Sequence, residues 1–100
     1  MGRSGLEVIL KGITIDRHGT VTVEPGWQNV LRDLALDLQD LIPHPVDVEH
    51  VLAALVMSVR DGRILAEVDL NEVRSSHQRI LVEYVNLLFQ QFPGTLDPPE

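Results

Sequence analysis

Cysteine is absent from this sequence of 100 residues. Its absence excludes disulfide bonds, thiolate zinc sites and cysteine nucleophiles. Basic residues are few, because one lysine and seven arginines stand against 15 carboxylates and leave a net charge of −7. The cations are scattered along the chain, whereas binding to a phosphate backbone depends on clustered ones. We therefore expect no direct contact with nucleic acid.

Long hydrophobic runs are also missing. A helix that crosses a membrane needs roughly 18 or more predominantly apolar residues in succession, and charged or polar residues interrupt every run here before that length. The first residues, MGRSGL, contain no apolar segment of the kind that directs secretion. We expect a soluble, cytoplasmic protein without a membrane partner.

What the chain does have is enough apolar content for one core. Hydrophobic residues make up 44% of the sequence, which suffices for a small domain without support from a metal or a disulfide. We expect a single domain over residues 1–94. Residues 95–100 are rich in proline and aspartate, and the sequence predicts a disordered tail there.

The N-terminal part has the pattern of a β-hairpin over residues 6–24. Val8 and Leu10 lie at even-numbered positions, and Ile13 and Ile15 lie at odd-numbered ones. The alternation of inward-facing residues therefore changes near Gly12, where we expect a β-bulge. The segment 16–19, DRHG, is a typical turn because aspartate opens it and glycine tolerates a positive φ.

Three helices follow in the sequence. Apolar residues at three- and four-residue spacing predict a first helix over 27–42, which ends before two prolines. The second begins after Asp47 as N-cap and ends at Asp61 and Gly62. The third starts at Asp69 or at Ser75 and runs to about residue 92. The predicted fold class is α+β, with the element order β-β-α-α-α.

The second helix has two different faces. One is fully apolar and should belong to the core, and the other carries His50, Ala54, Met57 and Asp61. The sequence does not say whether this smoother face meets the hairpin, another helix or a partner. The core face consists of Val48, Val51, Leu52, Leu55, Val56 and Val59.

The third helix carries more apolar residues than one packing face requires. Val82 and Phe89 lie on one edge of its apolar arc, and Leu87 lies on the other. An arc of this breadth is typical of a helix covered from two sides or shared with another chain. We expect these positions, together with His50 and Met57, to form an interaction surface.

An acidic stripe on the first helix offers a second possible surface. Asp33, Asp37 and Asp40 are spaced by four and three residues and therefore lie on one side of the helix. A basic partner would find complementary charge there. The alternative interpretation is an ordinary solvated face.

Catalytic and metal-binding patterns are weak. His50 is the best single candidate for acid-base chemistry because it lies on an otherwise apolar helix. Asp47 and His50 share a face, but a helix cap explains Asp47 without a metal. The serines lack a nucleophile motif such as GxSxG. We expect no metal site, no cofactor and no small-molecule ligand.

These observations favour a non-enzymatic module for protein-protein interaction, an adaptor or accessory subunit that also associates with itself as a homodimer. One alternative is an acidic antitoxin or immunity-type inhibitor that neutralises a basic partner through Asp33, Asp37 and Asp40. The other alternative is a small enzyme or ligand carrier that uses His50.

Overall fold

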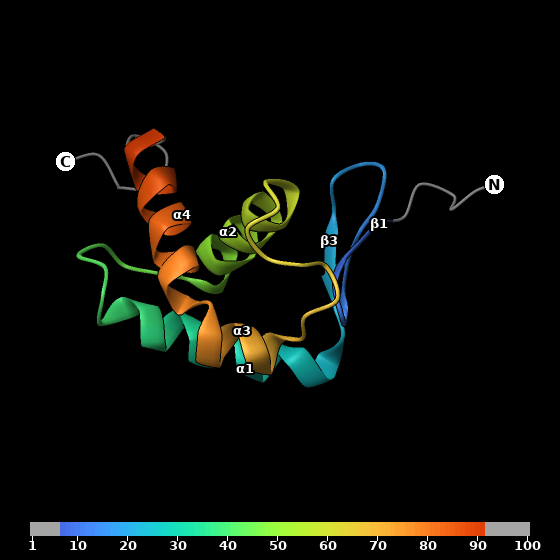
Figure 1. Ribbon diagram of the computed structural model, residues 1–100, viewed down its shortest axis with the longest axis horizontal. Coiled ribbons are helices and arrows are strands. Elements are labelled where there is room, and N and C mark those ends of the chain that lie inside the picture. Colours follow the sequence, from blue (N-terminus) through green and yellow to red (C-terminus); the bar gives the residue numbers. More distant parts are fainter. Residues whose placement is uncertain (1–6, 92–100) are drawn as a thin grey trace.

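The computed structural model describes residues 7–91, and these form an α+β domain in which a small sheet precedes four helices. The α+β class predicted from the sequence is thus confirmed, although the described residues form one strand and one helix more than expected. The predicted tail at 95–100 lies outside the described residues. The elements share one hydrophobic core. In Figure 1 the helix α1 runs along one side, α2 and α4 lie across it, and the sheet stands at one end.

The sheet is an antiparallel meander of β1 (Glu7–Leu10), β2 (Ile13–Ile15) and β3 (Val21–Val23), with β2 in the centre. The residue expected to form only a bulge, Gly12, lies in a tight turn that divides the predicted first strand into two. Its φ is +82°, a value that glycine adopts without strain. The ladder register also shifts between Val8 and Leu10, so a bulge and a turn occur together.

The turn between β2 and β3 forms as the sequence predicts. The Asp16 carboxylate accepts hydrogen bonds from the backbone N–H groups of His18 and Thr20, each at 2.9 Å. Gly19 follows with a φ of +87°. This aspartate-centred turn brings β3 back beside β2, with Thr14 opposite Thr22.

The helices are α1 (Pro25–Gln39), α2 (Val48–Arg60), α3 (Leu70–Ser76) and α4 (Gln78–Gln91). Helix α1 begins at a proline, a residue favoured in the first helical turn. It ends before Pro43, which cannot continue a helix, and the Gln39 side chain holds the loop that follows. Its Nε2 donates to the His44 carbonyl at 2.8 Å, and its Oε1 accepts from Val46 N at 2.8 Å.

The predicted third helix is divided at His77. Of its two predicted starting points, Asp69 caps a helix, whereas Ser75 lies inside α3 and α4 begins at Gln78. Asp69 caps α3 by accepting a hydrogen bond from Glu72 N at 3.0 Å. His77 has a φ of −119° and a ψ of 14°, which end α3. Its carbonyl then accepts from the N–H groups of Ile80 and Leu81 at the start of α4. Its buried Nδ1 has no hydrogen-bond partner among the described residues.

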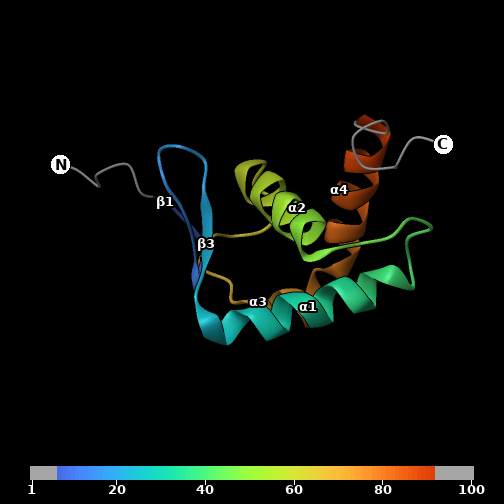
Figure 2. The ribbon, with the colours of Figure 1, turned by 180° about the vertical axis from the view of Figure 1, so that it is seen from behind.

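The core lies where the sheet and α2 meet the other helices. Helix α2 packs most extensively against α4 and also against α1 and β1. Figure 2 shows the same arrangement from behind, with α2 between the sheet and α4. The fully buried large side chains come from β1, β2, the loop after α2 and all four helices, and are Leu10, Ile13, Leu31, Leu34, Leu38, Val51, Leu55, Ile64, Leu70, Val73, Leu81 and Val85.

The buried stripe of α2 differs from the predicted one. Ala54, which the sequence placed on the second face, is fully buried together with Ser58. Leu52 and Val56, predicted for the core face, are only partly buried. The small side chains allow the neighbouring helices to approach α2 closely, so the core stripe lies on the side of Ala54. As a result, one apolar side of α2 is left at the surface.

Candidate functional site

The uncovered side of α2 forms an apolar groove with the start of β3. Its volume is about 260 Å³, and it is lined by Val21, Leu52, Ala53 and Val56, with Glu49 at its rim. We call these five residues the β3–α2 groove. Leu52, Ala53 and Val56 are neighbours on one side of the helix and are partly buried, while Glu49 is exposed. The groove therefore combines an apolar floor with a negative charge.

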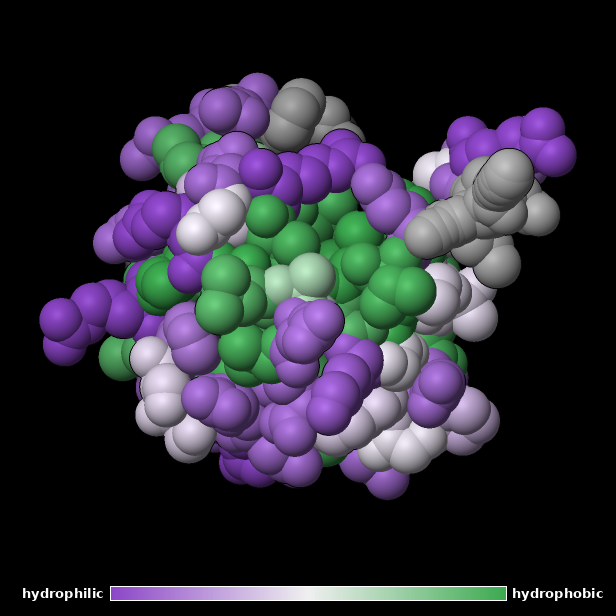
Figure 3. Space-filling model, turned by 45° about the vertical axis from the view of Figure 1, so that its right-hand side comes forward, coloured by the Kyte–Doolittle hydropathy of each residue, from purple (hydrophilic) through white to green (hydrophobic). Residues whose placement is uncertain are grey.

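Hydrophobic side chains also gather on a larger scale. Figure 3, a view that brings the sheet end of the molecule forward, shows a continuous hydrophobic area bordered by hydrophilic residues. A continuous apolar area with a polar border is typical of surfaces that contact another molecule. The large hydrophobic residues that are individually most exposed are Val8, Leu36, Leu41, Leu65 and Leu87.

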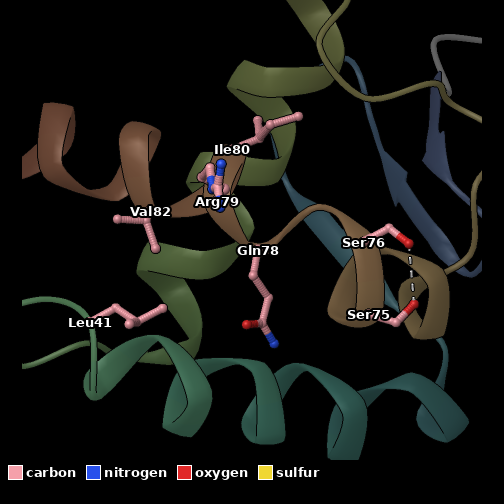
Figure 4. Close-up of a pocket in the computed structure, with 7 residues that line it drawn as sticks. All are labelled: Leu41, Ser75, Ser76, Gln78, Arg79, Ile80 and Val82. Atoms are coloured by element: carbon pink, nitrogen blue, oxygen red, sulfur yellow. Dashed lines mark hydrogen bonds between the residues drawn. The ribbon is translucent and has the colours of Figure 1, made fainter.

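A second, wider groove lies between the end of α1 and the junction of α3 and α4. Its volume is about 730 Å³. Figure 4 shows Leu41 and Val82 at one end, the hydroxyls of Ser75 and Ser76 at the other, and Gln78 extending toward α1. The two serine oxygens are 3.5 Å apart. Arg79 and Ile80 complete the lining, in which no carboxylate or imidazole stands beside a hydroxyl to act as a base.

The predicted acidic stripe is partly neutralised within the chain. Arg74 Nε donates to Asp37 Oδ2 at 2.7 Å, and its guanidinium lies 3.4 Å from Asp33 Oδ2. Gln78 Nε2 donates to the same Asp37 oxygen at 3.2 Å. The hydrogen bond to Asp37 holds the pKa of Arg74 above its ordinary value. Asp40 is exposed and has no hydrogen-bond or ion-pair partner within residues 7–91, whereas Asp33 and Asp37 are engaged, so the geometry does not favour the stripe as a docking site for a basic protein.

His50 has a structural role at the start of α2. Its Nδ1 accepts a hydrogen bond from the backbone N–H of Asp47 at 2.9 Å, which completes the cap of this helix. Its ring lies 4.9 Å from the ring of Phe89, and the ring of His44 stacks on Phe89 at 4.5 Å. The described residues contain no cluster of three potential metal ligands. His50 is thus placed as a capping and packing residue.

The expected surface on the last helix is smaller than predicted. Phe89 is 6% exposed and packs inside the domain, which corrects its assignment to an outer edge. The two histidines that cover it come from the loop before α2 and from α2 itself, and sequence spacing within α4 cannot reveal them. Val82 and Met57 are partly buried against the core, and Leu87 is 37% exposed. Self-association through this helix stays a prediction.

The groove residues themselves were not singled out by sequence reasoning. The available signal was the width of the apolar arc of α2, because Leu52 and Val56 extend it beyond the buried stripe. Val21 could not be linked to them, since no local pattern tells which strand a helix will lie beside. The tertiary structure alone brings them together.

A polar cluster fixes the end of α2 against α4. The Tyr84 hydroxyl donates to Asp61 Oδ2 at 2.7 Å, and Arg63 lies 5.9 Å from the centre of the tyrosine ring. Arg63 also pairs with Glu83 at 3.2 Å. The hydrogen bond to Asp61 raises the pKa of Tyr84 above its ordinary value. The bond is lost when the phenol ionises.

Titration of this tyrosine is a direct test of the cluster. Tyr84 is the one tyrosine of the chain, so phenolate absorbance reports it alone. We expect its midpoint above about 10, the ordinary value, and an Asp61→Asn variant should titrate at lower pH. Because the folded pKa is the higher one, the bond stabilises the fold below that ordinary value and is lost as pH rises through the folded pKa. An unchanged midpoint in Asp61→Asn, equal to that of an Asp40→Asn control, would contradict the assignment.

Comparisons of the chain with models of protein families, with curated proteins and with solved structures found no match. Within residues 7–91, no helix is long and apolar enough to cross a membrane. The argument for function therefore depends on the geometry of the described surfaces.

Proposed function

We propose that this chain is a non-enzymatic, cytoplasmic module that binds another protein, as an adaptor or accessory subunit, through the β3–α2 groove. The observation that supports the proposal is the groove itself, an apolar recess on a chain of strong negative charge. The fully buried large side chains come from β1, β2, the loop after α2 and all four helices, whereas Val21, Leu52 and Val56 of the groove pack at the margin of this core and are only partly buried.

Binding is favoured over catalysis by the way the polar side chains are used. The nitrogen of His50 that could act as a base accepts a capping hydrogen bond. Asp37 is engaged by Arg74 and Gln78, and the Tyr84 hydroxyl by Asp61. A general base must be able to reach a substrate proton in a cleft. The lining of the β3–α2 groove offers only Glu49 for such a role, and that carboxylate is exposed.

The size of the groove indicates what kind of contact it can make. Its volume is about 260 Å³, and burying one Leu-sized side chain contributes about 1.5–3 kcal/mol. A micromolar complex requires roughly 8 kcal/mol. The groove therefore supplies an anchor for a partner whose remaining contacts lie along the adjoining surface.

Selection from a library of displayed peptides tests this function. We expect wild-type protein to enrich peptides that combine apolar residues with lysine or arginine. An Ala53→Glu variant, which places a carboxylate on the floor of the groove, should bind the selected peptides at least about tenfold more weakly, because a charge would be buried without a partner. Asp40→Asn is the matched control outside the groove and should bind as wild type does.

Two results would count against the proposal. If the selected peptides bind Ala53→Glu as tightly as wild type, the groove is not the binding site. Circular dichroism must first show that this variant is folded. Light scattering on the same samples tests the expected homodimer, since a dimeric wild type and a monomeric Ala53→Glu variant would assign the groove to self-association.

A further inference from the structure

We propose that the partner of the groove is an extended, basic segment of another protein, which adds to the sheet as a fourth strand beside β3 and inserts an apolar side chain between β3 and α2. This inference rests on the proposed function and specifies the chemistry of its partner.

The first argument comes from the free edge of the sheet. Strand β3 pairs with β2 on one side and has no strand on the other side within the described residues. Glu24 N donates to the Gly12 carbonyl and Asp16 N to the Thr20 carbonyl. This register directs the backbone groups of Thr22 toward β2 and those of Val21 and Val23 away from it.

The outward groups are available for pairing. Within residues 7–91, no hydrogen bond outside the sheet engages the backbone N–H or C=O of Val21 or Val23. Two donors and two acceptors thus stand in a row along this edge, which is the arrangement that accepts an added strand.

The second argument is that the free edge and the groove share a residue. Val21 presents its backbone to the edge and its side chain to the groove. Because side chains alternate along a strand, every second residue of an added segment points to one face. One such residue would contact Leu52, Ala53 and Val56. A helix would need a longer row of pockets to receive its successive anchors, and the groove spans less than two turns of α2.

The third argument is electrostatic. Glu49 stands exposed at the rim of the groove, and the chain has a net charge of −7. A basic segment is attracted to this surface, whereas a second copy would bring another −7 to it. Charge complementarity thus favours a basic partner segment over a β3-to-β3 dimer.

The experiment uses a synthetic peptide of alternating lysine and valine with one central leucine, added to the isotopically labelled full chain. We expect amide hydrogen exchange of Val21 and Val23 to slow by at least about tenfold on binding, while Thr22, already paired with β2, changes little. A peptide with glutamate in place of lysine should bind at least about tenfold more weakly. The Glu49→Gln variant should bind the lysine peptide more weakly by up to about fivefold, because a single exposed charge pair contributes little.

The outcomes separate this inference from the proposed function. If peptides bind and Ala53→Glu abolishes binding, but exchange of Val21 and Val23 is unchanged, strand addition is wrong and the proposed function stands. Slow exchange of Val21 and Val23 in a dimeric protein without peptide would show that a second copy occupies the edge, and this also overturns the inference. If neither this peptide nor any library peptide binds, the proposed function itself fails.

Discussion

Replacing Gly12 with alanine is expected to destabilise the protein by roughly 1–3 kcal/mol more than replacing Gly19 with alanine. Both glycines have a positive φ, +82° and +87°, so both substitutions carry the cost of roughly 1–2 kcal/mol for a left-handed alanine. A Cβ on Gly19 meets nothing within 4 Å. A Cβ on Gly12 would overlap Cδ1 and Nε1 of the Trp27 indole. The ring must therefore move away from the turn between β1 and β2.

Urea denaturation followed by fluorescence measures this difference. Trp27 is the single tryptophan of the chain, so its emission reports the site of the clash directly. We expect Gly12→Ala to change the emission of the folded protein, and Gly19→Ala to leave it as in wild type. Equal loss of stability in the two variants, with unchanged emission, would show that the indole does not lie over Gly12.

Replacing Ala54 with leucine should destabilise the fold, while the same change at its neighbour Ala53 should be tolerated. Ala54 is fully buried in the core, and inserting larger side chains into a packed core typically costs about 1–3 kcal/mol. Ala53 lines the β3–α2 groove, where an added side chain meets a recess. Leucine has a slightly lower helix propensity than alanine, and the difference is the same at both positions. Helix propensity therefore does not separate the two variants.

Thermal denaturation compares the two variants under one condition. For a domain of this size, about 1 kcal/mol shifts the midpoint by roughly 4–8 °C. A midpoint near that of wild type is expected for Ala53→Leu, and a clearly lower one for Ala54→Leu. The filled groove of Ala53→Leu should also bind library peptides more weakly. If Ala53→Leu proves as destabilised as Ala54→Leu, the groove is part of the packed core.

The helix boundaries show which signals act locally. Asp47 and Gly62 delimit α2 as the sequence predicts, because capping depends on residues within one turn. The same locality explains the predicted start at Asp69, which caps α3. The other predicted start, Ser75, lies inside α3, and α4 begins at Gln78 after a break at His77 that no capping pattern indicated.

The sequence did not predict the division of the first strand at Gly12. A change in which alternate positions are apolar is compatible with either a bulge inside one long strand or a turn between two short ones. The contact between Gly12 and Trp27 joins the turn to α1, and such a contact lies beyond any local pattern. For the same reason, Phe89 was placed at the surface although His44 and His50 cover it.

The sequence by itself determined the α+β class, the ends of α2, the turn at Asp16 and the acidic charge of the surface, because each depends on composition or on residues close in the chain. The tertiary structure alone decided which side of α2 is buried. Apolar residues surround most of the circumference of α2, so periodicity could not fix the buried stripe, which follows the small side chains of Ala54 and Ser58. That packing leaves Leu52, Ala53 and Val56 beside Val21, and it thereby creates the β3–α2 groove.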